Sequence, residues 1–225
     1  MDWQALALSL KLAILTSVVL LPIAMAIARA LAYGRFGAKS ILEALVLLPL
    51  MLPPTVLGFY LLVALSPKSA FGQAMARLFG EPLVFSFSGI LIASLIANLP
   101  FAVQPMARAF EAIPETLREA GYVSGLTRLQ TFLKIELPLA WPGIVTALAL
   151  VFVHTLGEFG VVLMMGGNIP GATRTLSIAI YDSVQGFKFS EAAAMSGVLV
   201  VIASLTVAMV LALSRRGALG RERRA

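Results

Sequence analysis

The sequence predicts an all-α, polytopic membrane protein with five transmembrane helices, or six if one short apolar segment also crosses. Of its 225 residues, 60% are hydrophobic and 12% are charged, and the mean hydropathy is +0.95. This composition cannot be packed into one water-soluble domain without exposing large apolar areas, so the expected solvent is lipid. Five stretches satisfy the length of about 20 apolar residues that a bilayer core requires. We therefore expect residues 1–225 to form a single transmembrane domain.

The first two stretches should differ in shape. Residues 12–28 form the first, and they lack a convincing signal-peptide cleavage site, so we expect a retained membrane helix. Residues 45–65 form the second, which contains Pro53-Pro54. Proline removes a backbone donor and prevents a straight helix, so this stretch should kink or unwind. Irregular backbone is tolerated at membrane depth only where protein or water satisfies it, which suits a helix that lines a cavity.

The third stretch covers residues 85–103, and the fourth covers residues 144–165. The fourth contains His154 and Glu158, which lie four residues apart on one helical face. They either belong to a path or gate, or they are a buried, mutually satisfied pair or groups at an interface. We favour the second interpretation. Two such groups are too few for an active site. With no cysteine and no His-Glu-x-x-His pattern, we predict no catalytic residues and no metal site.

We expect the last stretch, residues 195–213, to enter the membrane from the outer side. The preceding segment, residues 172–184, is apolar enough to enter the bilayer and too short to cross it. A re-entrant helix or a helix on the outer face therefore fits this segment better than a sixth span.

Orientation follows from the 17 basic residues, because Lys and Arg are retained on the cytoplasmic side. Alternate connections contain five and twelve of them, which places the amino terminus outside, the carboxyl terminus inside and the loop at about 105–142 in the cytoplasm. This placement explains the net charge of +6 without nucleic acid. The five are Lys11, Lys68, Arg77, Arg174 and Lys188; the twelve are Arg29, Arg35, Lys39, Arg108, Arg118, Arg128, Lys134, Arg215, Arg216, Arg221, Arg223 and Arg224.

The cytoplasmic loop predicts a helix, a glycine corner and a second helix. Pro114 opens the first helix and Gly125 ends it. Thr127 and Gln130 have the spacing of a capping box at the start of the second, which we expect to end at Pro138. Such a hairpin suits insertion into a groove of a partner protein, although an amphipathic loop on the bilayer surface is an equal alternative.

The same loop resembles the EAA---G---------I-LP signature of ABC importer permeases, the inner-membrane components of binding-protein-dependent transport systems. The matching residues are Glu119, Ala120, Gly121, Gly125, Ile135, Leu137 and Pro138. Gly121 replaces the second alanine and keeps the position small. The resemblance implies a type I ABC importer permease fold in which this loop docks onto a separate ATPase. The segment at residues 34–40 lacks the Gly-Lys of a phosphate loop, so ATP and magnesium are expected in that partner and no cofactor in this chain.

Longer stretches resemble the permeases of the molybdate, tungstate and sulfate group, and most closely those for molybdate. They are HTLGEFGVVLMMGGNIPGATRTLSIAIYD, LLPLMLPPTVLGFYLL and NLPFAVQPMARAFEAIP. The resemblance implies a non-catalytic subunit that imports molybdate across the bacterial inner membrane by alternating access. It further implies a homodimer, two cytoplasmic ATPase subunits and a periplasmic oxyanion-binding protein. A sulfate, thiosulfate or tungstate permease is the alternative, and a stand-alone ion-coupled carrier fits less well because of the docking hairpin.

An oxyanion that enters the membrane loses strong hydration, so its path should offer hydroxyls, amides, backbone donors or helix amino termini. Binding along the path should be weak, because tight binding would trap the ion. The candidates for the path or gate are Pro53, Pro54, Thr55, Thr155, Glu158, Asn168, Thr173 and Ser177. Gly157, Gly160, Gly166 and Gly167 either permit close approach of helices or of the anion, or serve packing alone.

Overall fold

A computed structural model describes residues 1–222, except for the side chains of Leu211 and of residues 213–222. The described chain is all-helical, as predicted, and contains no β-strand. Within the described part of the chain, four helical segments are long and apolar enough to cross a membrane: α1 (Trp3–Tyr33), α5 (Phe87–Glu111), Arg128–Gly157, which includes α8 (Leu137–Gly157), and Phe189–Val210 within α11 (Phe189–Glu222). A fifth crossing results if α2 (Lys39–Met51) and α3 (Pro54–Leu65) form one bent span, which agrees with the predicted five.

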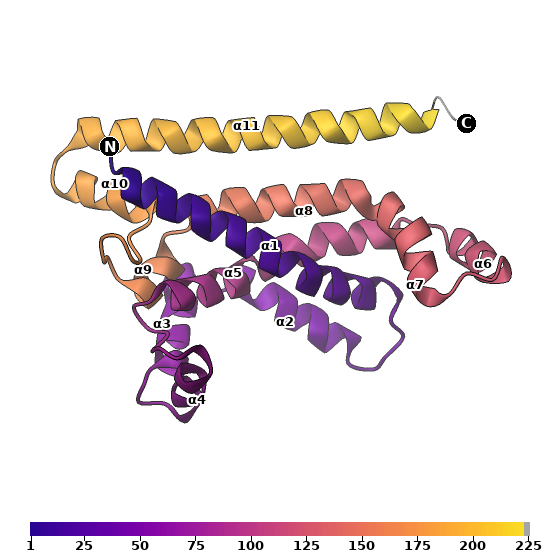
Figure 1. The fold of residues 1–225 in the computed structure, drawn as a ribbon, viewed down its shortest axis with the longest axis horizontal. Helices are drawn as coiled ribbons and strands as arrows, with labels where there is room; N and C mark the ends of the chain where they lie inside the picture. The colour runs from indigo at the N-terminus through magenta and orange to yellow at the C-terminus, as the bar shows by residue number, and fades with distance from the viewer. Residues whose placement is uncertain (223–225) are drawn as a thin grey trace.

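Short helices lie at the two ends of these long segments (Figure 1). One end holds α4 (Ala70–Phe79), α9 (Gly160–Gly166) and α10 (Leu176–Gln185), together with the amino terminus. The other end holds α6 (Glu115–Val123), α7 (Arg128–Thr131) and a π-helix (Phe132–Glu136). The molecule therefore has two ends formed by short helices, separated by the length of the long helices.

The core of the bundle forms where α1, α5 and α8 pack against one another. Small side chains allow this close packing, which in lipid depends on van der Waals contact more than on the hydrophobic effect. At Gly143 of α8, an added Cβ would lie 2.3 Å from the Cβ of Ala109 in α5. The buried alanines of this core are Ala24, Ala28, Ala102, Ala107, Ala140 and Ala147.

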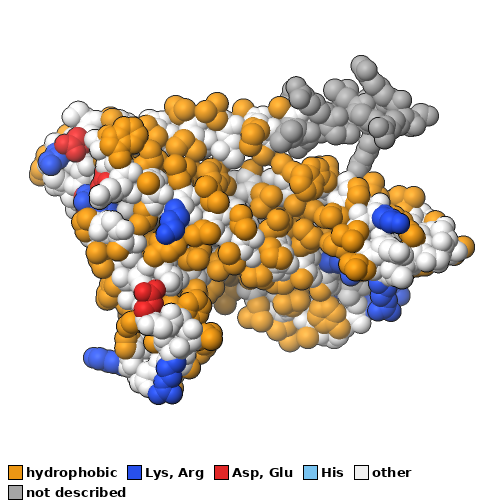
Figure 2. Space-filling model, in the orientation of Figure 1, with side chains coloured by type: hydrophobic (Ala, Val, Ile, Leu, Met, Phe, Trp, Pro, Cys, Tyr) orange, Lys and Arg blue, Asp and Glu red, His pale blue; other side chains and the backbone are white. Residues whose placement is uncertain are grey.

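The outer surface of the long helices is apolar, which suits contact with lipid or with other membrane subunits. Figure 2 shows hydrophobic side chains over most of one face, whereas the basic groups gather mainly near the two ends. In the most apolar window of α11 only 11% of the residues are buried, so this helix lies on the outside of the bundle. Its exposed large side chains include Val200, Val201, Leu205, Val207 and Met209.

The break predicted in the second span is confirmed. Helix α2 ends at Met51, Leu52 and Pro53 are extended, and Pro54 begins α3 at an angle of 111° to α2. Proline suits the first position of a helix because its missing N–H would have no intrahelical partner there. Neither half, with 13 and 12 residues, is long enough to cross a bilayer core alone.

The fourth predicted span, at residues 144–165, is not one helix. Helix α8 ends at Gly157, Glu158 is extended, and α9 begins at Gly160. Upstream, the prediction that Pro138 ends the second hairpin helix is wrong, because α7, the π-helix and α8 are continuous. The π-turn closes on a bond from the Leu137 N–H to the Phe132 carbonyl and leaves Pro138 in the first turn of α8, where proline is tolerated.

The doubtful segment at residues 172–184 forms a turn followed by α10, which is too short to cross. Helix α10 packs against α11, α1 and α8 at the end opposite the hairpin. On the face shown in Figure 2, the described basic side chains gather mainly near these two ends. The basic residues Arg223 and Arg224, and the side chains of Arg215, Arg216 and Arg221, lie outside the described residues.

Candidate functional site

The predicted hairpin at residues 114–138 projects from one end of the bundle (Figure 1). Its corner is a Schellman motif at the end of α6, in which the Leu126 N–H bonds to the Gly121 carbonyl and the Gly125 N–H to the Tyr122 carbonyl. Gly125 has φ +80°, a left-handed conformation that glycine adopts without a steric penalty. The capping box of Thr127 and Gln130 then starts α7, as predicted. Local signals therefore account for the shape of the hairpin.

The signature residues divide into a packed set and an exposed set. Gly121 is buried, and a Cβ added there would lie 2.7 Å from the Cδ1 of Ile135. The two ends of the signature thus pack together, which explains why this position must remain small. Glu119, Ala120 and Gly125 are exposed, and they face away from the bundle's core. This division leaves one side of the hairpin free for a partner.

The hairpin also exposes several large apolar side chains. Val123, next to the corner, is 89% exposed, and four further large side chains are at least 40% exposed. Several exposed apolar groups on one short hairpin favour an interaction surface. The four are Leu117, Tyr122, Leu129 and Leu133.

A buried ion cluster lies where the hairpin joins the long helices. The Glu136 side chain is fully buried, and its carboxylate accepts hydrogen bonds from the guanidinium of Arg29 at 2.6 and 3.2 Å and from that of Arg118 at 3.1 Å. The Arg118 guanidinium lies 3.6 Å from the centroid of the Tyr33 ring. The Tyr33 hydroxyl donates to the Phe110 carbonyl at 2.9 Å. Helices α1, α5 and α6 and the π-helix therefore meet at one set of polar contacts.

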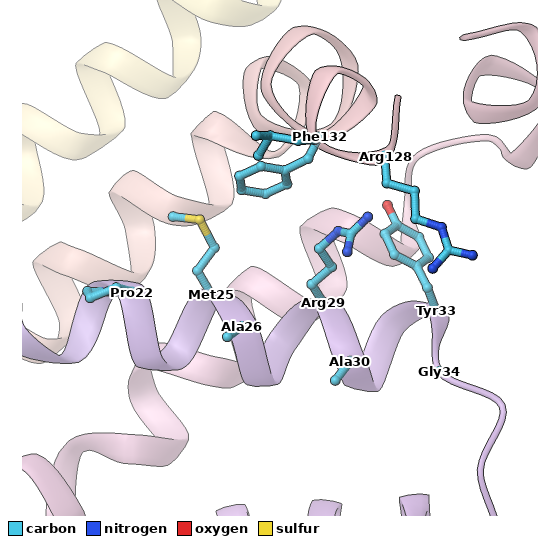
Figure 3. Close-up of a pocket in the computed structure, with 10 residues that line it drawn as sticks. Pro22, Met25, Ala26, Arg29, Ala30, Tyr33, Gly34, Arg128 and Phe132 are labelled. Carbon is cyan, nitrogen blue, oxygen red and sulfur yellow. The ribbon is translucent and has the colours of Figure 1, made fainter. Parts of the chain in front are cut away.

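An open groove of about 750 Å³ borders this cluster, between α1 and the start of the α7 segment. Figure 3 shows Arg29 and Tyr33 extending from α1 towards Arg128 and Phe132 on the hairpin side. The Arg29 guanidinium is 5.6 Å from the centroid of the Phe132 ring. Pro22, Met25 and Ala26 continue the groove along α1 as an apolar wall.

Three of the predicted path residues have hydroxyl groups that are already engaged. The Thr155 hydroxyl donates to the Val151 carbonyl, and the Thr173 hydroxyl donates to the Gly166 carbonyl. Both threonines are at most 2% exposed. The Ser177 hydroxyl donates at 3.0 Å to the Leu156 carbonyl, in the last turn of α8. In this conformation the Ser177 contact lies at the break between α8 and α9, the Thr173 contact lies at the end of α9, and the Thr155 contact lies within α8.

The remaining candidates lie nearer the surface. Pro53, Pro54 and Thr55 are exposed at the break between α2 and α3. The Asn168 amide donates to the Asp182 carboxylate at 2.6 Å, an exposed bond at the end opposite the hairpin.

Glu158 lies at the break between α8 and α9 and is 7% exposed. Its carboxylate accepts the N–H of Val161 at 3.2 Å, and the other oxygen lies 3.8 Å from the Nδ1 of His154. His154 also lies 3.1 Å from the Asn98 side-chain oxygen and stacks on Phe101. A carboxylate at the amino terminus of α9 is favoured by the free N–H groups there. The geometry thus gives Glu158 a local structural role.

The two helix breaks lie side by side. A Cβ added at Gly160 would lie 2.8 Å from the Cβ of Pro54 and 3.3 Å from the Thr55 nitrogen. Gly160 and Gly166 therefore serve close packing, whereas Gly157 is exposed and faces open space. Gly167 differs from these three glycines, because its φ of +65° requires glycine's conformational freedom. Interrupted helices that meet inside a membrane domain are suited to lining a polar passage.

Sequence reasoning missed the ion cluster. Glu136 occupies the variable position of the signature, and Arg29 and Tyr33 follow the first apolar stretch. The available signal was a carboxylate between two apolar signature residues, which indicates a buried charge. Its partners could not be predicted, because Arg29 and Arg118 lie 107 and 18 residues away in the sequence. Within residues 1–222, no three acidic or histidine side chains lie close enough together to hold a metal ion.

Comparisons with known proteins agree with this architecture. Residues 19–219 match the family described as binding-protein-dependent transport system inner membrane component. The molybdenum transport system permease protein of Azotobacter vinelandii is 46% identical over 96% of this chain and 95% of its own length. The sulfate transport system permease protein of Escherichia coli strain K12 is 32% identical over 81% of this chain and 65% of its own length. A bacterial ABC transporter that imports alginate shares the fold, with a TM-score of 0.77 and 22% identity over 95% of this chain and 78% of that chain.

Proposed function

The chain belongs to the family of inner membrane components of binding-protein-dependent transport systems, and from this membership we propose that it is the permease subunit of an ATP-driven molybdate importer. The observation that carries the proposal is the exposed, apolar hairpin that bears the family signature. The likeness to a molybdenum permease over almost the whole of both chains supports molybdate as the substrate. A permease of this kind is a multi-pass protein of the inner membrane.

The proposed mechanism is alternating access by two copies of this chain, which enclose the path between them. Two ATPase subunits bind the two hairpins. When the ATPase subunits close on ATP, the membrane helices shift towards the outward-facing state. A complete reversal of the population requires about 5.5 kcal/mol of difference between the two states. ATP and magnesium are bound by those partners, and a periplasmic binding protein delivers the anion.

We place the anion's path beside the two helix breaks. Thr55 and the exposed backbone around Pro53 and Pro54 supply polar groups there, and Gly157 leaves room for the ion or its remaining water. The hydroxyls of Thr155, Thr173 and Ser177 are engaged by backbone carbonyls, and they could reach an anion only in a different state of the cycle. Binding along the path should be weak, because a transported ion must also leave it.

The orientation proposed is an external amino terminus and a cytoplasmic hairpin and carboxyl terminus. Since the chain contains no cysteine, a single Val123→Cys substitution provides a unique label at an 89% exposed position. A membrane-impermeant thiol reagent should modify it only from the cytoplasmic side. Modification of intact cells from outside would reverse the orientation.

The central test is uptake of labelled molybdate into vesicles that contain the purified permease, its ATPase and its binding protein. Uptake should require ATP and all three components. Transport of molybdate by this chain alone would refute the proposal. A sulfate permease is the second candidate because the sulfate relative is 32% identical over 81% of this chain. Excess unlabelled sulfate that abolished molybdate uptake, while tungstate did not, would favour the sulfate function.

A further inference from the structure

The second half of the hairpin is continuous with α8, and an ion cluster joins the hairpin to α1 as well. Helix α6 packs chiefly on α7 and on the π-helix, which are parts of the hairpin itself. Beyond those contacts, the Arg118 side chain extends from α6 to Glu136 and to the ring of Tyr33. Glu136 in turn binds Arg29 of α1 through two hydrogen bonds. The carboxylate therefore forms a bridge between the hairpin and the first membrane helix.

The carboxylate at the centre of the bridge is buried and paired on both sides. The Glu136 side chain is 0% exposed, and those of Arg118 and Arg29 are 18% and 35% exposed. A buried carboxylate with two guanidinium partners has few alternative positions, since any other leaves a charge unpaired. The net positive charge of the three groups lies against the face of Tyr33, which attracts cations.

The π-helix determines which way the carboxylate points. The extra residue in a π-turn rotates the following residues by about 100° relative to a regular α-helix. Glu136 is the last residue of that turn and faces the protein interior, between α1 and α6. The Tyr33 hydroxyl extends the bridge to the end of α5 through its bond to the Phe110 carbonyl.

We propose that Glu136, held by Arg118 and Arg29, is a positioning residue that transmits hairpin movement to α1 and α5. The inference rests on the proposed function, because it presumes that an ATPase moves the hairpin. It assigns a role to a residue at the variable position of the family signature. When the hairpin moves, α1 and the end of α5 follow as one body with it.

The sharpest test is Arg118→Gln, which detaches α6 from the bridge and leaves Glu136 paired with Arg29. Arg108→Gln is the matched control, because Arg108 lies at the start of the same loop and its 2.9 Å ion pair with Glu111 is exposed. Glu136→Gln is the second variant, which removes the central charge. Each permease is reconstituted with saturating ATPase and with molybdate-loaded binding protein. Molybdate transported per ATP hydrolysed and the unfolding temperature are measured for each.

We expect Arg118→Gln and Glu136→Gln to lower the transport-to-hydrolysis ratio about tenfold, within the range of typical coupling factors. Arg108→Gln should keep the ratio of the unmodified protein. An unchanged ratio in Arg118→Gln would overturn the inference. It would also be overturned if both activities fell in parallel at constant ratio with a lower unfolding temperature, because that pattern indicates a purely structural role. Absence of ATP-dependent uptake by the unmodified protein would instead refute the proposed function itself.

Discussion

Replacing Gly125 by alanine tests whether the partner ATPase binds the hairpin in the observed conformation. Gly125 has φ +80°, and a Cβ added there meets no atom within 4 Å. The substitution therefore changes only the backbone preference of the corner and leaves its packing unchanged. Gly37 is the matched control, because a Cβ added there also meets nothing and its φ lies outside the left-handed region.

The expected magnitude follows from the cost of a left-handed conformation. For an L-residue this conformation costs about 1–2 kcal/mol. Alanine also lowers the entropy of the unfolded chain, which offsets about 0.4–1 kcal/mol of that cost. The net cost is therefore about 1 kcal/mol. If the free hairpin relaxes and must re-form this corner on binding, the Kd for the ATPase rises about fivefold. Gly125→Asn should cost less, because asparagine tolerates this conformation better than alanine does.

The measurement is a titration of purified permease with the ATPase subunit, followed by calorimetry. The expected order of Kd values is Gly125→Ala highest, Gly125→Asn intermediate, and Gly37→Ala equal to the unmodified protein. An unchanged Kd in Gly125→Ala would refute the reasoning, because the partner would then bind without requiring the left-handed corner. A rise in the Gly37→Ala control would show that glycine content alone accounts for the effect.

Three further predictions concern packing, charge and capping. Gly143→Ala should lower stability to thermal or detergent unfolding by about 1–3 kcal/mol, since the added Cβ overlaps the facing helix, whereas Gly197→Ala in open space should not. Glu158→Gln should reduce molybdate uptake less than Glu119→Lys does, because the first only weakens a helix-end contact and the second alters the exposed signature; the opposite order would place Glu158 in the path. Thr127→Ala should cost about 0.5–2 kcal/mol of hairpin stability through loss of the capping box, measured as faster amide exchange in residues of α7, and unchanged exchange would contradict this.

Much of the hairpin could be predicted because its signals are local. Gly125, Thr127 and Gln130 act on backbone groups within a few residues, so the corner and the capping box were both correct. The Pro53-Pro54 break was equally predictable, since proline blocks the helix through its own ring and missing N–H. The prediction failed at Pro138, because a π-turn admitted the proline at the start of a longer helix.

The break after Gly157 had no comparable local signal. No proline lies there, and α9 starts where Glu158 binds the backbone N–H of Val161 and Ser177 binds the last turn of α8. Ser177 reaches that turn from a separate helix, so the contact depends on how the chain folds back. The same is true of Gly160, whose packing against Pro54 joins segments that are distant in sequence.

The sequence by itself determined that the chain is surrounded by lipid, that it is all-helical, where its spans approximately lie, and that it carries the hairpin. These features depend on hydropathy and backbone preference, which act over one turn or along one helix. Only the tertiary structure decided that Glu136 bridges α1 and α6, and which hydroxyls are engaged and which face the surface. A buried charge or hydroxyl is placed by partners that satisfy it, and those partners can lie anywhere in the chain. Arg29 and Glu136, 107 residues apart, meet because three packed helices bring them together.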